Sequence, residues 1–179
     1  MRTFSETPML DFKKKIRSIS DWPQKGVIFR DITPALQDKR YLQTLIRELT
    51  RPYRKKKVDV VVGIDARGFL LASAVACRLR SGLSIVRKKG KLPYKTLRKK
   101  YTLEYAANVL EMHKDAVSSG QRVLMVDDLL ATGGTMKAAV DIVKKLGGKI
   151  IGIAFFVELA DLKGRRKLKG YKITSLVKY

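Results

Sequence analysis

Two adjacent carboxylates stand directly before a glycine-rich turn. The segment 126–135 reads VDDLLATGGT, so Asp127 and Asp128 are followed by a short turn of small residues. Small residues let backbone N–H groups surround a phosphate, and they do so best where a helix begins. The two acids would repel a bare phosphate, but they suit sugar hydroxyls and a Mg²⁺ ion held among neighbouring oxygens. The segment therefore predicts a site for a ribose phosphate.

The same turn argues against the commoner phosphate-binding motifs. A P-loop ends in Gly-Lys-Ser/Thr, whereas this turn ends in Gly133, Gly134 and Thr135 with no lysine. A dinucleotide fingerprint needs G-x-G-x-x-G, which the sequence lacks. An ordinary strand-to-helix turn explains a lone TGG string well, but it explains the whole ten-residue segment poorly.

Two scarce residue types narrow the chemistry further. The chain has one cysteine, Cys77, and one histidine, His113. A disulfide within the chain is therefore excluded, and a Cys/His zinc site is close to excluded. A Ser-His-Asp mechanism would have to use His113, which lies in a charged stretch with no nucleophile signature nearby. Any metal is expected to be a hard cation with oxygen ligands, Mg²⁺ first.

The charge is extreme for a chain of 179 residues: 39 Lys and Arg against 16 Asp and Glu give a net charge of +23. Such an excess implies anionic partners, which include phosphorylated substrates and nucleic acid or another polyanion, and charge alone does not choose among them. No apolar run approaches the roughly 18 residues of a membrane helix. The first ten residues show no signal-peptide pattern. A cytoplasmic protein is expected.

Short β-branched runs alternate with helical stretches, which predicts an α/β fold with a central, mostly parallel sheet flanked by helices. In open sheets of this kind ligands bind at the carboxyl ends of the strands. The expected strands are 58–64, 83–86, 122–126 and 149–157, with 172–177 at an edge, and the expected helices are 69–79 and 135–146, the second ended by Gly147 and Gly148.

The first part of the chain has a different pattern. Residues 9–19 and 41–53 are each expected to form a helix, the first of them basic and amphipathic. Between them, residues 22–34 contain too many turn residues for a regular element. We expect one domain over 1–179, with a small N-terminal hood over 1–35.

The residues above resemble the type I phosphoribosyltransferases. VDDLLATGGT is similar to their phosphoribosyl pyrophosphate motif, and GVIFRDITP (26–34) resembles the base-binding hood of members that use adenine. Four more segments match in the same order: the pyrophosphate loop GIDARGFL (63–70), the basic loop RKKGKLP (87–93), the mobile catalytic loop LEY (103–105) and the C-terminal segment ELADLKGRRKL (158–168). Nearly the whole chain is covered.

The resemblance implies purine salvage: transfer of the 5-phosphoribosyl group from phosphoribosyl pyrophosphate to adenine, giving AMP and pyrophosphate, with Mg²⁺ as cofactor in a homodimer. Two alternatives stay open at this point. One is a phosphoribosyltransferase for another purine base, and the other is a non-catalytic nucleic-acid-binding regulator on the same fold.

The resemblance also assigns roles to residues. Asp127 and Asp128 are expected to hold the ribose hydroxyls and to support Mg²⁺. Glu104 is expected to accept the proton at the purine ring nitrogen, Arg67 to stabilise the leaving group, and Tyr105 to cover the site. The remaining expected contacts are Ala131, Thr132, Gly133, Gly134 and Thr135 for the 5-phosphate, Asp65, Ala66, Arg67, Gly68, Arg87, Lys88 and Lys91 for pyrophosphate, and Ile28, Phe29 and Arg30 for adenine.

Overall fold

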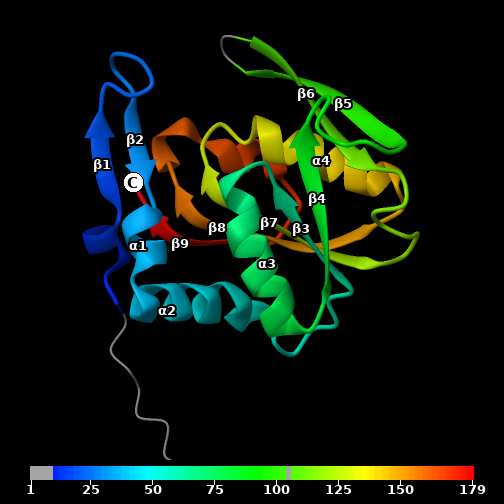
Figure 1. Ribbon diagram of the computed structural model, residues 1–179, viewed down its shortest axis with the longest axis horizontal. Helices are drawn as coiled ribbons and strands as arrows, with labels where there is room; N and C mark the ends of the chain where they lie inside the picture. The colour runs from blue at the N-terminus through cyan, green and yellow to red at the C-terminus, as the bar shows by residue number, and fades with distance from the viewer. Residues whose placement is uncertain (1–9, 104–105) are drawn as a thin grey trace, which may run out of the picture. The chain divides into compact units, whose positions relative to one another are not determined.

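The structure, a computed structural model, describes residues 10–103 and 106–179 (Figure 1). The chain divides into two compact units, Met1–Arg47 and Glu48–Tyr179. A single domain with a hood over 1–35 stays a prediction, and each unit is described by itself below. No helix among the described residues is both long enough and apolar enough to cross a membrane.

The first unit is built around a two-stranded antiparallel sheet. A short 3₁₀ helix, η1 (Phe12–Lys15), precedes strand β1 (Arg17–Ser20), which pairs with β2 (Ile28–Asp31) so that Arg17 lies opposite Asp31. Helix α1 (Thr33–Gln37) follows at once, and its first turn is fixed by Asp31, whose carboxylate accepts the Thr33 amide at 2.9 Å. Helix α2 (Lys39–Thr50) begins in this unit.

Two expectations for this region were wrong. The helix expected over 9–19 is only the one turn of η1, because Ile16 is extended and the following residues pair with β2. The stretch 22–34, expected to be irregular, is a turn only up to Val27 and then contains β2 and the start of α1. Periodicity within a segment does not reveal hydrogen bonds to another segment, and the β1–β2 pairing decides both cases.

The second unit contains a seven-stranded sheet in the order β5-β6-β4-β3-β7-β8-β9. Pairing among β4, β3, β7, β8 and β9 is parallel, whereas β6 pairs antiparallel with both β4 and β5. The strands are β3 (Val60–Ile64), β4 (Gly82–Lys88), β5 (Thr96–Leu103), β6 (Ala106–His113), β7 (Arg122–Leu130), β8 (Lys149–Glu158) and β9 (Ile173–Lys178). The predicted mostly parallel α/β sheet is confirmed, with β9 at an edge as expected.

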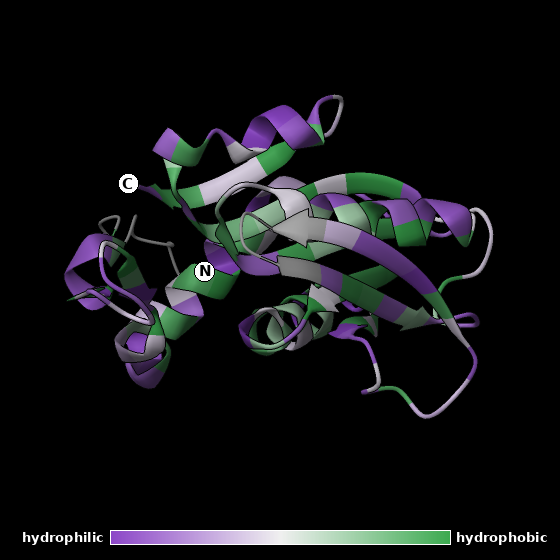
Figure 2. Ribbon diagram, turned by 90° about the horizontal axis from the view of Figure 1, so that it is seen from above, coloured by the Kyte–Doolittle hydropathy of each residue, from purple (hydrophilic) through white to green (hydrophobic). Residues whose placement is uncertain are grey.

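The helices of this unit cover opposite faces of the sheet. A side chain at Gly63 would meet Ala72 of α3 (Arg67–Leu79), so alternate residues of β3 face that helix. The intervening residues Val60, Val62 and Ile64 lie in the core cluster that also contains the buried face of α4 (Gly134–Lys145). In Figure 2 hydrophobic residues run through the central strands, while many connecting segments are hydrophilic.

Short 3₁₀ helices complete the second unit: η2 (Arg51–Tyr53) follows α2, and η3 (Ala160–Leu162) and η4 (Gly164–Leu168) lie between β8 and β9. Helix α4 ends where the two glycines were expected to stop it. Gly147 has a φ of 91°, and the amides of Gly147 and Gly148 donate to the carbonyls of Lys144 and Val143. Such left-handed glycine caps satisfy the last carbonyls of a helix.

Candidate active site

The predicted site residues around β3 and β7 lie near the carboxyl ends of these two adjacent parallel strands. Strands β3 and β7 run side by side in register from Val60 opposite Val123, so their carboxyl ends meet at one edge of the sheet. The segment Asp65–Gly68 follows β3 directly and leads into α3. Strand β7 continues through Asp127 and Asp128 to Leu130, four residues further than expected, so both acids lie on the strand itself.

The segment after β3 is in direct contact with Asp127 and Asp128 of β7. A Cβ atom on Gly68 would lie 2.5 Å from Asp127 Oδ1 and 3.2 Å from its Cα, so only glycine fits at this approach. Arg67 Nη2 lies 2.6 Å from Asp128 Oδ2, in an ion pair whose side chains are 29% and 9% exposed. That oxygen has no partner in hydrogen-bond geometry within the described chain, so the contact is electrostatic. The structure thus places Arg67 on the acid predicted to bind ribose.

The two neighbouring carboxylates have different surroundings. Burial raises the pKa of Asp127 well above its usual value, and the adjacent charge of Asp128 raises it further. The Asp127 side chain also accepts the Asp128 amide at 2.9 Å. Asp128 is buried and carries the contact with the guanidinium of Arg67. The two acids therefore differ: burial disfavours a charge on Asp127, whereas a guanidinium faces Asp128.

The turn after β7 leads directly into a helix. Gly133 has a φ of 78° and precedes the first residue of α4, Gly134, with no side-chain cap hydrogen bond at Gly133. A Cβ atom on Gly133 would lie 2.5 Å from the carbonyl oxygen of Gly164, so both its conformation and its packing require glycine. The first amides of a helix lack partners within the helix and attract anions. The predicted phosphate turn 131–135 therefore has the expected local structure.

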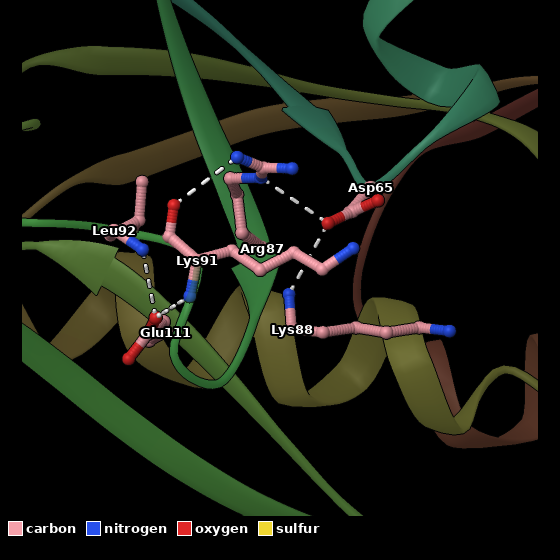
Figure 3. A network of polar contacts seen from close by, with 6 residues as sticks. All are labelled: Asp65, Arg87, Lys88, Lys91, Leu92 and Glu111. Carbon is pink, nitrogen blue, oxygen red and sulfur yellow. Dashed lines mark hydrogen bonds and ion pairs between the residues drawn. The ribbon is translucent and has the colours of Figure 1, made fainter.

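The basic loop after β4 is tied to the loop after β3. Arg87 Nε lies 3.3 Å from Asp65 Oδ2, and Arg87 also donates to the Lys91 carbonyl at 3.2 Å (Figure 3). The Lys88 amide lies 3.5 Å from the same Asp65 oxygen. The Asp65–Ala66 peptide bond is cis. Asp65 therefore joins the two segments that were predicted, from separate motifs, to bind pyrophosphate.

Glu111, on β6, is a further residue of this network that sequence reasoning missed. Its fully buried carboxylate accepts the amides of Lys91 and Leu92 at 3.0 and 3.2 Å and Arg98 Nε at 3.1 Å. Burial raises its pKa, but the hydrogen bonds from the loop amides and Arg98 outweigh burial and hold the pKa below its usual value. An acid among the apolar residues of NVLEMH was the available signal.

The residues predicted to bind adenine lie on β2 of the first unit. Phe29 packs edge-on against Trp22, with ring centroids 4.3 Å apart. Ile28 is 49% exposed, and the Arg30 guanidinium bonds to the Ser18 hydroxyl on the paired strand. Glu104 and Tyr105, predicted as proton acceptor and cover, lie outside the described residues.

The described residues do not form a metal site from side chains alone. Within residues 10–103 and 106–179, no group of three or more His, Cys, Asp or Glu side chains could hold an ion. Asp127 and Asp128 offer carboxylate oxygens at the sheet edge, and Mg²⁺ typically takes one or two carboxylates and completes its shell with substrate phosphates and water. These two residues fit a Mg²⁺ ion that arrives with its substrate.

Comparison with known proteins shows the family of the chain. The phosphoribosyl transferase domain matches residues 34–178. The adenine phosphoribosyltransferase of Methanococcus maripaludis is 51% identical over 170 residues, covering 95% of this chain and 99% of the relative. The crystal structure of the enzyme from Thermoanaerobacter pseudethanolicus has a TM-score of 0.91 and 49% identity, covering 94% of this chain and 98% of that one.

A structure with a bound base is also similar. The Giardia lamblia enzyme, solved with 9-deazaadenine, has a TM-score of 0.90 and 34% identity, covering 94% of this chain and 96% of that one. The domain match covers residues 34–178, and the alignments with these relatives cover 94–95% of the chain. The chain therefore belongs to the phosphoribosyl transferase family and, within it, to the adenine phosphoribosyltransferases.

Proposed function

We propose that this chain performs purine salvage by transferring the 5-phosphoribosyl group of phosphoribosyl pyrophosphate to adenine, with AMP and pyrophosphate as products. The observation that carries the proposal is the meeting of Arg67 and Asp128 at 2.6 Å, beside a glycine-rich turn that opens α4. A cation for a leaving pyrophosphate, acids for a ribose and amides for a phosphate are thereby set along one sheet edge.

The sugar phosphate would be held by β7 and the turn that follows it. Asp127 and Asp128 would accept hydrogen bonds from the ribose hydroxyls, and amides from Ala131 to Thr135 would surround the 5-phosphate. The two threonine hydroxyls, of Thr132 and Thr135, would add further donors. Holding the sugar at both ends fixes the reacting carbon relative to the base and the leaving group, which lowers the entropic part of the barrier.

Departure of pyrophosphate is the step that needs positive charge. The bond from the ribose carbon to the pyrophosphate oxygen breaks as the bond to the purine nitrogen forms, so negative charge builds on the leaving group. Arg67 would stabilise that charge, together with the amides of Ala66 and Gly68 and the side chains of Arg87, Lys88 and Lys91. Figure 3 shows the Lys88 and Lys91 side chains extending away from Glu111, which holds the backbone of their loop.

Mg²⁺ is proposed to bind with the substrate, held by Asp127 and Asp128 on the protein side. The ion, when bound, would neutralise part of the pyrophosphate charge. For the base, Phe29 is proposed to stack on the purine, with the backbone at Ile28 and Arg30 reading its edge. Glu104 is proposed as the proton acceptor and Tyr105 as the cover of the site.

Incubating the purified chain with phosphoribosyl pyrophosphate, Mg²⁺ and each purine base in turn tests the proposal. We expect AMP and pyrophosphate with adenine only. IMP or GMP in place of AMP would reassign the base, and salt-sensitive binding of DNA or RNA without any turnover would favour a nucleic-acid-binding role.

The chain is also proposed to act as a homodimer, as the resemblance to the family implies. Light scattering coupled to size-exclusion chromatography measures the mass directly. A mass of one chain at assay concentrations would rule out the dimer as the active form, provided that turnover is measured in the same sample.

A further inference from the structure

The segment after β8 packs backbone to backbone against the proposed phosphate turn. Gly164, the first residue of η4, is buried, and a Cβ atom there would overlap the Ala131 carbonyl oxygen and lie 3.1 Å from the Gly133 amide nitrogen. The relation is reciprocal, because a Cβ atom on Gly133 would lie 2.5 Å from the Gly164 carbonyl oxygen. The turn 131–133 thus rests on Gly164, and a shift of either backbone must move the other.

Gly164 is in turn held through its neighbour, Arg165. The guanidinium of Arg165 binds the Glu158 carboxylate with two nitrogens, each at 2.7 Å from an oxygen, and donates to the Ser175 hydroxyl at 2.9 Å. Ser175 completes the triangle by donating to Glu158 at 2.5 Å. A forked pair of this kind fixes both the position and the orientation of the arginine. Two sheet strands, β8 and β9, therefore set the place of residue 165.

Strand β8 also pairs with the end of β7, directly before the phosphate turn. Glu158 lies opposite Leu130, the last β7 residue before the turn, and the next amide, from Leu159, donates to the Leu130 carbonyl at 2.9 Å. At its other end η4 is fixed by Leu168, which is 1% exposed within the core cluster shared with α4. The segment is thus fixed on both sides of Gly164, the residue that contacts the phosphate turn.

We propose that Glu158, Arg165 and Ser175 are positioning residues that hold Gly164 against the turn 131–133 and so set its affinity for the 5-phosphate. The inference rests on the proposed function, because it takes that turn as the 5-phosphate site. None of the three side chains is required to touch the ligand. Their effect passes through one backbone contact, which makes it specific for ligands that carry a 5-phosphate.

This specificity separates positioning from general stability. Ribose 5-phosphate would occupy the turn, whereas inorganic pyrophosphate would bind at Arg67 and the basic loop. Loss of the Arg165 fork should weaken binding of ribose 5-phosphate about tenfold, or 1.4 kcal/mol, and leave pyrophosphate affinity within about twofold. A destabilised but otherwise intact protein would lose neither affinity selectively.

The experiment measures dissociation constants for both ligands by titration calorimetry, well below each variant's unfolding temperature. The variants are Arg165→Met, Arg165→Lys and Gly164→Ala. Arg165→Lys keeps the charge without the fork, so an intermediate loss is expected. Gly164→Ala is expected to give the largest loss, because its Cβ would displace the turn directly.

Gly170→Ala is the matched control. Gly170 has a φ of 89°, and a Cβ atom there would meet nothing within 4 Å, so the substitution adds backbone strain without touching the turn. Its affinity for ribose 5-phosphate should equal that of the wild type.

The outcomes separate the inference from the function on which it rests. A wild-type chain that makes no AMP would overturn the proposed function. A wild-type chain that makes AMP, with Arg165→Met and Gly164→Ala both retaining its ribose 5-phosphate affinity, would overturn the inference alone. If Arg165→Met does not fold, Arg165→Lys and Gly164→Ala decide the matter by the same ratio of affinities.

Discussion

Arg67 and Asp128 put opposite charges in contact where the ribose and the leaving group are proposed to meet. Their separation of 2.6 Å means that a pyrophosphate group approaching Arg67 must share the guanidinium with Asp128. Such sharing keeps the cation oriented before the substrate arrives, which is how preorganised charges contribute most to catalysis.

Arg67 is proposed to carry the positive charge that faces the leaving group. Replacing it with glutamine should lower kcat by about 10²- to 10³-fold, because charge on the departing pyrophosphate loses its partner. Pyrophosphate release under saturating substrates measures the effect. Arg78→Gln, an exposed arginine on the same helix, is the control and should leave kcat unchanged. Equal rates for the two variants would remove Arg67 from the mechanism.

The adjacent acids are predicted to respond differently to neutralisation. Because burial and the charge of Asp128 raise the pKa of Asp127, a neutral side chain is favoured there, and Asp127→Asn should leave the unfolding midpoint unchanged or raise it. Asp128→Asn should lower the free energy of unfolding by about 1–3 kcal/mol, because it removes the ion pair with Arg67. Thermal unfolding followed by circular dichroism compares the two. The reverse order of stability would show that the charge of the pair lies on Asp127.

Elements rather than single residues bring the basic loop into place. Strand β6 supplies Glu111, which holds the amides of Lys91 and Leu92, and Asp65 after β3 holds Arg87. The loop is therefore fixed from two strands that lie on either side of β4 in the sheet. These contacts fix the backbone at Lys88 and Lys91, two residues that resemble ordinary surface lysines in the sequence.

Glu111→Gln should raise KM for phosphoribosyl pyrophosphate about tenfold and leave KM for adenine within a factor of about two, because only the pyrophosphate loop loses its charged anchor. Steady-state kinetics with each substrate varied gives both constants. Asp141→Asn is the control: Asp141 pairs with Lys99 of β5 at 3.3 Å, as Glu111 pairs with Arg98 of β5, but Asp141 lies on α4. If KM for phosphoribosyl pyrophosphate rises equally in both variants, the effect comes from a general loosening of the sheet and not from loss of the Glu111 anchor.

The pH dependence of stability provides a second test with Glu111→Gln. The folded-state pKa of Glu111 is lowered, so its stabilisation is complete above the unfolded value of about 4.3 and is lost as the pH falls through the folded value. The difference in unfolding midpoint between the wild type and Glu111→Gln should therefore be largest near neutral pH and should shrink on acidification. A difference that is constant with pH would show that Glu111 carries no charge in the folded protein.

Sequence patterns predicted the parts of the fold that depend on local order. The hydrophobic runs of β3, β7 and β8 and the glycine stop of α4 are visible within single segments, and the structure has them close to where they were expected. Glu111 and the β1–β2 pairing were missed because hydrogen bonds to another segment, rather than the pattern within one segment, decide them. Strand β5 was not among the expected strands, although Leu97 and Tyr101, four residues apart on one face of it, pack against the core.

At the scale of the whole molecule, the excess of positive charge is the dominant electrostatic feature. Several acids are already engaged with basic side chains, as Glu158 is with Arg165 and Asp141 is with Lys137 and Lys99. Each such pair is neutral in itself, so the net charge of +23 is left to act on the surroundings. Such a field attracts multiply charged ligands over about 10 Å at 0.1 M salt.

Salt should consequently weaken capture of the charged substrate. Raising the ionic strength from about 0.01 to 0.3 M should lower kcat/KM for phosphoribosyl pyrophosphate about tenfold or more, because screening removes the long-range attraction. KM for adenine, which is uncharged, should stay nearly constant. Kinetics at matched free Mg²⁺ provides the measurement, and a salt-independent kcat/KM would show that the surface charge serves another partner.

The most direct test is a crystal structure of the chain grown with AMP. We predict the phosphate within about 2.7–3.2 Å of backbone nitrogens between Ala131 and Thr135, and the ribose hydroxyls at the same range from Asp127 and Asp128. AMP bound elsewhere, with that turn empty, would contradict the assignment of the site.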